Sequence, residues 1–203
     1  MNKKIVHDAL ILTAFTLVLG FVLGLVYGIT KEPIAAADAA TAQAAYQTVF
    51  ADASSFETYG DFDKDGAVSV MEESGFSDEI KDVQVAMDGS GNTLGYVITV
   101  IAKDASQANI TFSVGIANDG TVNGYSITNI AETPGLGMKA EDESFAGQFA
   151  NKLVDSFSIV KNTPASDSEV ESISGATITS KAMANGVNAC ITYFHNVLEG
   201  GAN

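Results

Sequence analysis

The stretch Leu94-Gly-Tyr-Val-Ile-Thr-Val-Ile-Ala102 decides the fold class, together with the apolar segments around it. Four segments follow the alternation of apolar and polar residues that is typical of strands facing one core: Asp82–Met87, Leu94–Ala102, Ala108–Ala117 and Thr121–Ile127. Short turn sequences rich in Gly and Asn separate them. Strands so close together in the chain predict an antiparallel meander rather than a parallel, doubly wound sheet.

Helical patterns flank these strands. The Ala-rich segment Ala35–Phe50 predicts a helix, and Phe145–Val154 predicts a short one. In Ser180–Glu199 apolar residues recur at helical spacing along one face, with Thr179 or Ser180 as the natural N-cap. The predicted fold class is therefore α+β.

The N-terminal segment Ala9–Thr30 carries no charged residue and is long enough to cross a bilayer, which takes ~20 residues of α-helix. Lys3 and Lys4 precede it and predict a cytoplasmic N-terminus, with the main domain on the outer side of a cell membrane. A cleaved signal peptide is the alternative, but its apolar region usually has only ~7–15 residues.

This pattern predicts three parts of the chain. We expect a cytoplasmic N-terminus and single-pass anchor over residues 1–31, a juxtamembrane helix and acidic loop over residues 32–80, and a ligand-binding domain over residues 81–203. The whole outer part would lie outside the membrane.

The composition excludes several kinds of site. Ten lysines, no arginine and a formal net charge of −15 argue against a nucleic-acid partner, because phosphate binding needs clustered cations. A single cysteine, Cys190, excludes an intrachain disulfide and a cysteine-ligated zinc or iron–sulfur centre. Since His7 and His195 are the only histidines, we expect the chemistry to depend on a cofactor.

The tetrad Ser174-Gly-Ala-Thr177 lies directly ahead of the last predicted helix. The backbone N–H groups of such a small-residue turn, and of the helix N-terminus behind it, suit an anion and above all a phosphate. Plain helix capping by Ser and Thr is the alternative. The residues by themselves leave both interpretations open.

Two motifs carry a resemblance to a known family. The tetrad residues Ser174, Gly175, Ala176 and Thr177 resemble the flavinylation motif of the FMN-binding domain that is shared by the G subunit of Rnf complexes and the C subunit of the sodium-pumping NADH:quinone oxidoreductase. The segment Glu132-Thr-Pro-Gly-Leu-Gly137 is similar to a loop that borders the flavin in that family. The resemblance implies an FMN-binding domain over residues 81–203 with covalent FMN, joined through its phosphate to Thr177 by a separate flavin transferase that uses FAD as donor.

The same resemblance implies further cofactor-binding residues, namely Glu132, Thr133, Leu136 and Gly137 of the loop, and Lys161. Lys161 falls where the family commonly has a lysine ahead of the tetrad. Glu171 stands where members often have Asp, so the charge is kept.

The Rnf resemblance implies an electron-transfer subunit of a membrane complex that couples ferredoxin oxidation and NAD reduction to the transport of Na⁺ or H⁺. Other membrane and peripheral subunits are the implied partners. The sequence has no GxGxxG fingerprint, which agrees with a relay rather than a complete enzyme. The alternatives are the FMN subunit of a sodium-pumping NADH:quinone oxidoreductase, a freestanding tethered FMN protein, and a non-redox, calcium-stabilised binding module.

The acidic segment Asp61–Glu72 fits the calcium-loop pattern D-x-D-x-D-G-x₅-E at every required position. Side-chain oxygens, one backbone carbonyl and a final bidentate carboxylate would bind Ca²⁺. The predicted ligands in chain order are Asp61, Asp63, Asp65, Ala67 and Glu72. An acidic surface turn without calcium is the alternative, since no clear pair of helices flanks the segment.

Overall fold

The computed structural model describes residues 3–199 and divides the chain into two compact units, Met1–Thr41 and Ala42–Asn203. Helix α1 (Lys3–Val49) forms the first unit and continues into the second. Its N-terminal part is long and apolar enough to cross a membrane, judged by length and composition. Nearly all large apolar side chains from Ile5 to Ile34 are exposed, as those of a lipid-facing helix are. The helix predicted from Ala35 is confirmed as the last part of α1.

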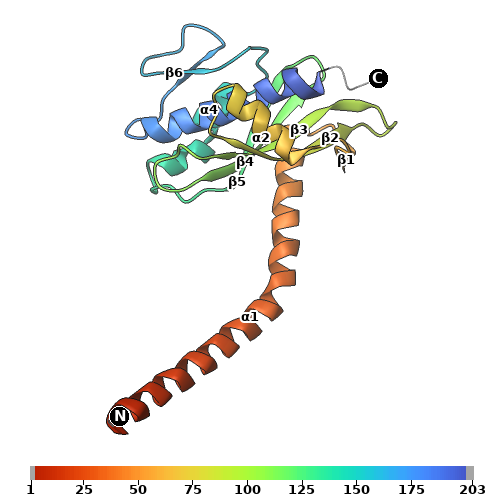
Figure 1. Ribbon diagram of the computed structural model, residues 1–203. Helices are drawn as coiled ribbons and strands as arrows, with labels where there is room; N and C mark the ends of the chain where they lie inside the picture. The colour runs from red at the N-terminus through yellow and green to blue at the C-terminus, as the bar shows by residue number, and fades with distance from the viewer. Residues whose placement is uncertain (1–2, 200–203) are drawn as a thin grey trace. The chain divides into compact units, whose positions relative to one another are not determined.

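A five-stranded antiparallel sheet with the strand order β1-β2-β3-β4-β5 forms the framework of the second unit (Figure 1). The strands are β1 (Ser55–Thr58), β2 (Glu79–Met87), β3 (Thr93–Ala102), β4 (Ile110–Ala117) and β5 (Val122–Asn129). Each strand pairs with its neighbour in chain order, so the four predicted strands, the meander and the α+β class are confirmed.

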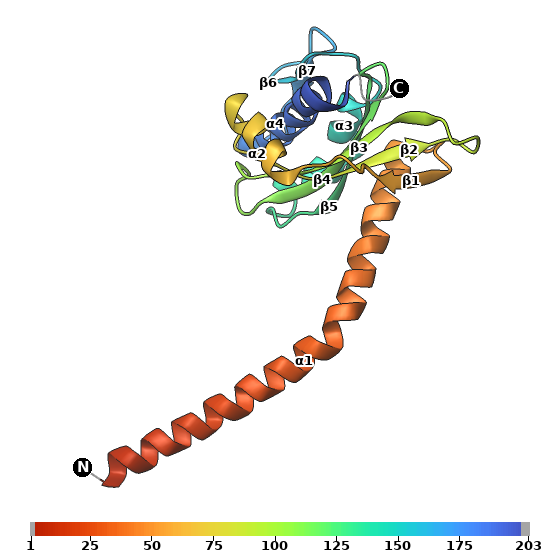
Figure 2. The same ribbon diagram turned by 45° about the vertical axis from the view of Figure 1, so that its right-hand side comes forward.

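Helices cover one face of this sheet. Helix α4 (Thr177–Tyr193) packs on β3 and β4, and α2 (Lys64–Glu73) lies beside it (Figure 2). The main core lies between these helices and the sheet. Phe112 and Met183 are among its fully buried side chains. The end of α1 contributes to a smaller core made of Val49, Phe50, Ala53, Ala86 and Val97.

The predicted helix Phe145–Val154 is wrong in its second half. The chain forms α3 (Glu143–Ala146) and the 3₁₀ turn η2 (Gly147–Phe149), and then becomes extended. Lys152 exchanges both backbone hydrogen bonds with Val122 at the start of β5. Pairing with the edge of the sheet thus replaces the last helical turns.

The segment after η2 leads to the last helix through a small sheet. Strands β6 (Ser158–Val160) and β7 (Glu169–Glu171) pair in parallel, apart from the main sheet. A π-helical turn, η3 (Phe194–Leu198), follows α4. β7 therefore leads directly into the tetrad.

Candidate functional site

The tetrad Ser174–Thr177 forms the entry to α4. The helix begins at Thr177, and Ala176 at the N-cap position has no side chain that can cap it. The predicted capping by Thr179 or Ser180 is therefore wrong. Ser180 stabilises the turn differently, because its hydroxyl donates to the Ala176 carbonyl at 3.0 Å and accepts from the Ile173 amide at 2.9 Å.

Thr177 is half-buried and occupies the first helical position of α4. The first N–H groups of an α-helix lack intrahelical acceptors, and the helix dipole adds positive charge at this end. A phosphate on Thr177 Oγ1 would lie where the backbone stabilises an anion. The first residue of α4 is thus suited to a phosphate-linked group.

The segment Glu132–Gly137, called the PGLG loop below, borders the tetrad. The Leu136 amide donates to the Thr133 carbonyl at 3.1 Å, which closes the loop on itself. Gly175 has a φ of +79°, and a Cβ there would lie 3.0 Å from Leu136 Cδ2. Glycine therefore allows the tetrad to take a left-handed turn next to Leu136.

A buried carboxylate joins the two motifs. Glu132 is 6 % exposed, and its Oε2 accepts from the Thr179 hydroxyl of α4 at 3.1 Å. Its Oε1 accepts from the Gln107 amide, in the connection between β3 and β4, at 3.0 Å. A Cβ at Gly137 would lie 2.5 Å from Glu132 Oε2 and 2.9 Å from Thr179 Oγ1, so no larger residue fits this contact.

A cavity of about 310 Å³, called the tetrad cavity, opens between the PGLG loop and α4. Leu136 and Ile178 give it an apolar rim, with 42 % and 60 % of their surface exposed. Its walls contain every predicted cofactor-binding residue except Ser174 and Lys161; the lining residues are Ser106, Glu132, Thr133, Leu136, Gly137, Gly175, Ala176, Thr177, Ile178 and Thr179.

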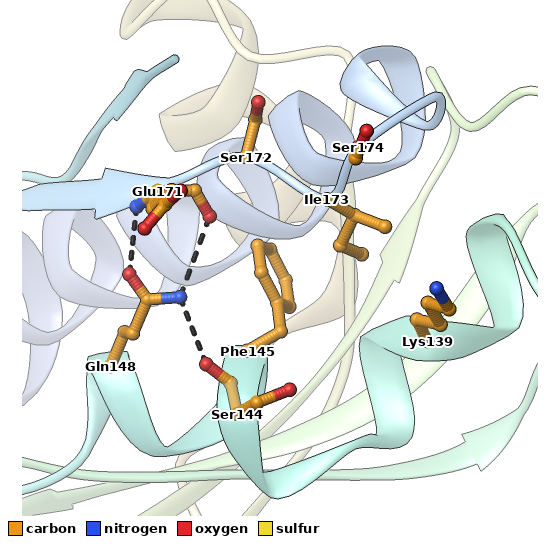
Figure 3. A pocket seen from close by; sticks show the side chains of 8 residues that line it. All are labelled: Lys139, Ser144, Phe145, Gln148, Glu171, Ser172, Ile173 and Ser174. Carbon is orange, nitrogen blue, oxygen red and sulfur yellow. Dashed lines mark hydrogen bonds between the residues drawn. The ribbon is translucent and has the colours of Figure 1, made fainter. Parts of the chain in front are cut away.

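A second cavity of about 240 Å³, called the lysine cavity, borders the tetrad at Ser174. Figure 3 shows it between the turn η1 (Gly137–Glu141) with α3 on one side and the segment leading into the tetrad on the other. The Gln148 amide fastens the two sides, since its Oε1 accepts from the Glu171 amide at 2.7 Å and its Nε2 donates to the Ser144 carbonyl at 3.1 Å. The lining residues are Lys139, Ser144, Phe145, Gln148, Glu171, Ser172, Ile173 and Ser174.

Lys161 lines neither cavity. It is exposed and follows β6, where the Val160 carbonyl accepts from the Ser172 amide at 2.8 Å. Lys161 therefore directly follows Val160, the residue that is hydrogen-bonded to Ser172 in the wall of the lysine cavity. Its contact with a cofactor stays a prediction.

The sequence analysis missed several polar residues of the two cavities, among them Ser106, Lys139 and Thr179. The position of Lys139, two residues after the PGLG loop, was a usable signal. Ser106 gave none, because its place depends on the long-range hydrogen bond between Gln107 and Glu132.

The predicted calcium loop is not formed. Helix α2 takes its central residues, and Asp63 caps this helix by accepting from the Asp65 amide at 3.1 Å. Ala67 is buried with its amide bonded to the Asp63 carbonyl, and Glu72 lies in the last helical turn. Among residues 3–199 no three His, Cys, Asp or Glu side chains lie together as a metal site, so the structure does not assemble the predicted ligands Asp61, Asp63, Asp65, Ala67 and Glu72.

The residues around the tetrad fit a phosphate-linked flavin. Thr177 offers a hydroxyl at a helix N-terminus, and the cavity rim offers apolar surface for an aromatic ring. Gly137 and Gly175 keep the backbone of both motifs free of side chains that would fill the space between them.

The chain is similar to proteins of known families. The FMN-binding domain family matches residues 106–192, and the RnfG N-terminal region matches residues 1–49. The G subunit of the proton-translocating ferredoxin:NAD(+) oxidoreductase complex of Clostridium ljungdahlii is 38% identical over 111 residues, which are 55% of this chain and 58% of that protein. NqrC of Shewanella oneidensis, a solved structure, is 20% identical with a TM-score of 0.48 over 56% of this chain and 57% of that chain.

A longer alignment covers almost the whole chain. The G subunit of the Na(+)-translocating ferredoxin:NAD(+) oxidoreductase complex of Acetobacterium woodii is 31% identical over 202 residues, which are 96% of this chain and 94% of that protein. The chain thus spans little more than half of the first relative but nearly all of this one. It belongs to the RnfG family, the G subunits of the ion-translocating, Rnf-type oxidoreductase complexes.

Proposed function

We propose that this chain carries FMN through a phosphoester to Thr177, and that it passes electrons within a membrane complex coupling ferredoxin oxidation and NAD reduction to ion transport. The observation that carries the proposal is the position of Thr177, which starts α4 and lines one cavity together with the PGLG loop. The match to the FMN-binding domain family and the alignment with the Acetobacterium woodii relative support it.

Attachment requires a second protein, because a threonine hydroxyl is a weak nucleophile. We propose a flavin transferase with FAD as donor. The bond between the FMN phosphate and Thr177 Oγ1 forms as the pyrophosphate bond breaks, AMP leaves, and the hydroxyl proton passes to a base of the transferase. Ser174 and Gly175 are exposed, so the turn is accessible to such an enzyme.

The chain's own residues position the group. When bound, FMN accepts and donates electrons, while the protein sets its place and access. The Thr179–Glu132 hydrogen bond holds the PGLG loop against α4. Leu136 and Ile178 offer apolar surface at the cavity rim, where an aromatic ring gains by leaving water.

We further propose that α1 anchors the chain as a single span, with the N-terminus in the cytoplasm and residues after Lys31 outside. A covalent link has a physical advantage there, because a dissociated FMN would be lost. The partners would be other subunits of an Rnf-type complex. The relatives are named for proton and for Na(+) translocation, and we propose one of these two ions.

In-gel fluorescence of the full chain, made together with a flavin transferase, tests this function. Wild type should give a flavin-fluorescent band after denaturing electrophoresis, and Thr177→Ala should lose the fluorescence. Thr163→Ala, an equal change at an exposed threonine between β6 and β7, should keep it. A fluorescent Thr177→Ala band would show that the attachment residue is wrong, and a wild-type band without fluorescence would remove the covalent link.

A further inference from the structure

We propose that the lysine cavity receives the pyrimidine end of the flavin ring, and that the Lys139 ammonium there sets the reduction potential of the flavin. The inference rests on the proposed attachment at Thr177. It adds a second subsite, formed by η1, α3 and the residues before the tetrad (Figure 3).

Among the described residues, Lys139 is the one lysine that lines either of the two cavities. The sequence has no arginine, so any side chain with a permanent positive charge near the flavin must be a lysine. Three lysines of the second unit are engaged in ion pairs: Lys64 and Lys103 with Glu79, and Lys152 with Asp167. In the described part of the chain Lys139 has no ion pair, and no other lysine lines either cavity.

The walls of the lysine cavity suit a flat heteroaromatic ring with a polar edge. Phe145 and Ile173 form the apolar part of its lining. The hydroxyls of Ser144, Ser172 and Ser174 form no hydrogen bond with another described residue and are free for a ligand. The Gln148 side-chain amide is already hydrogen-bonded to backbone groups of both walls. It therefore links the two walls and is not available to the ligand.

The tetrad cavity offers a different set of groups. Glu132 and Thr179 are bonded to each other and line it as neighbours of Thr177. Thr177 itself lines this cavity, so the chain that leads from the linkage to the ring begins there, and the apolar rim at Leu136 and Ile178 contacts the near end of the ring. Ser174 and Thr177 belong to one turn, so a ligand fixed at Thr177 can extend along the tetrad into the lysine cavity.

The sign of the effect follows from electrostatics. Reduction adds electrons to the ring, and a nearby ammonium stabilises the added negative charge. Lys139 should therefore raise the reduction potential. Glu171, a carboxylate on the opposite wall of the cavity, acts in the opposite direction.

The test is a redox titration of the full flavin-loaded chain in detergent against a reference dye. Lys139→Gln should shift the reduction equilibrium about tenfold toward the oxidised flavin, equal to ~30 mV for two electrons. Lys139→Arg should restore the wild-type value. Lys81→Gln removes an equal charge from exposed β2, outside both cavities, and should change nothing.

The attachment is checked separately, by the mass of the Thr177 peptide in every variant. Flavin present at Thr177 with the same potential in Lys139→Gln and wild type would overturn the role of Lys139. A larger shift in Lys161→Gln than in Lys139→Gln would overturn it as well. Wild type without flavin at Thr177 would overturn the proposed function, and this subsite with it.

Discussion

The acidic segment Asp61–Glu72 and the proposed flavin site use their polar side chains in opposite ways. In the acidic segment the carboxylates are exposed, and Asp63 bonds to the amide of Asp65 to start a helix. At the proposed flavin site Glu132 is buried and bonds to Thr179, which lies 47 positions away in the chain. The calcium-loop pattern lies within one short segment, and that segment forms helix α2 instead. The tetrad and the PGLG loop lie in two distant segments, and the packing of the domain holds them together.

The largest expected difference in stability between the two regions comes from changing one glycine to alanine in each. Gly137→Ala should lower the free energy of unfolding by about 3 kcal/mol and reduce flavin loading, because the new Cβ would lie 2.5 Å from Glu132 Oε2. Gly66→Ala should raise stability by about 0.5 kcal/mol, since Gly66 lies inside α2 and its close neighbour is the exposed carboxylate of Asp63. Chemical unfolding of both full-length variants gives the two signs. Equal losses in both would contradict the account.

A smaller effect comes from removing one hydrogen bond in each region. Thr179→Val should lower the free energy of unfolding by about 2 kcal/mol, because it leaves Glu132 Oε2 buried without a donor. Ser69→Ala should change it by less than about 0.5 kcal/mol, since the Ser69 hydroxyl bonds to the Asp65 carbonyl on the exposed side of α2. Denaturant titrations of the two variants measure the difference. If the Thr179→Val protein were as stable as Ser69→Ala, the hydrogen bond between Thr179 and Glu132 would not stabilise the site.

Asp78 extends the comparison to the effect of pH on stability. Among the described residues, only one oxygen of its buried carboxylate has a hydrogen-bond donor. Asp78 is 4 % exposed, Oδ1 accepts from the Lys103 amide, and Oδ2 has no partner among the described residues. Burial raises the pKa of Asp78 to about 6. The folded chain therefore holds this proton more tightly than the unfolded chain, whose aspartates have a pKa of about 3.9.

The stability that this proton provides is complete below pH ~4 and is lost as the pH rises through ~6. We expect the free energy of unfolding to fall by up to about 2 kcal/mol over that range. Asp78→Asn should remove most of this slope. Unfolding curves at several pH values from 4 to 7 measure it, and an unchanged slope in Asp78→Asn would assign it to other groups.

The smallest expected effect is that of calcium. At ~1 mM Ca²⁺, where weak extracellular sites fill, the unfolding temperature should not change, because α2 occupies the place of the loop. Differential scanning calorimetry of the full chain with and without the ion measures this. An increase that Asp65→Asn abolishes would mean that the segment opens and binds calcium.

The sheet could be predicted because alternating side chains report directly which face of a strand is buried. The tetrad and the PGLG loop were recognisable as motifs, and their contact followed once the fold brought them together. Helix α2 was missed because the spacing of its acidic residues matched a metal loop, while the capping bond of Asp63 depends on backbone angles. Ser106 was missed because it joins the wall of the tetrad cavity from a segment far from the other lining residues in the chain.

The central claim is that Thr177 carries the flavin, and one measurement tests it most directly. The full chain, made together with a flavin transferase, is digested, and the mass of the peptide that contains Thr177 is determined by fragmentation. The account predicts an added mass of one FMN less one water, located on Thr177. Added mass on Ser174 or Thr179, or an unmodified peptide, would contradict it.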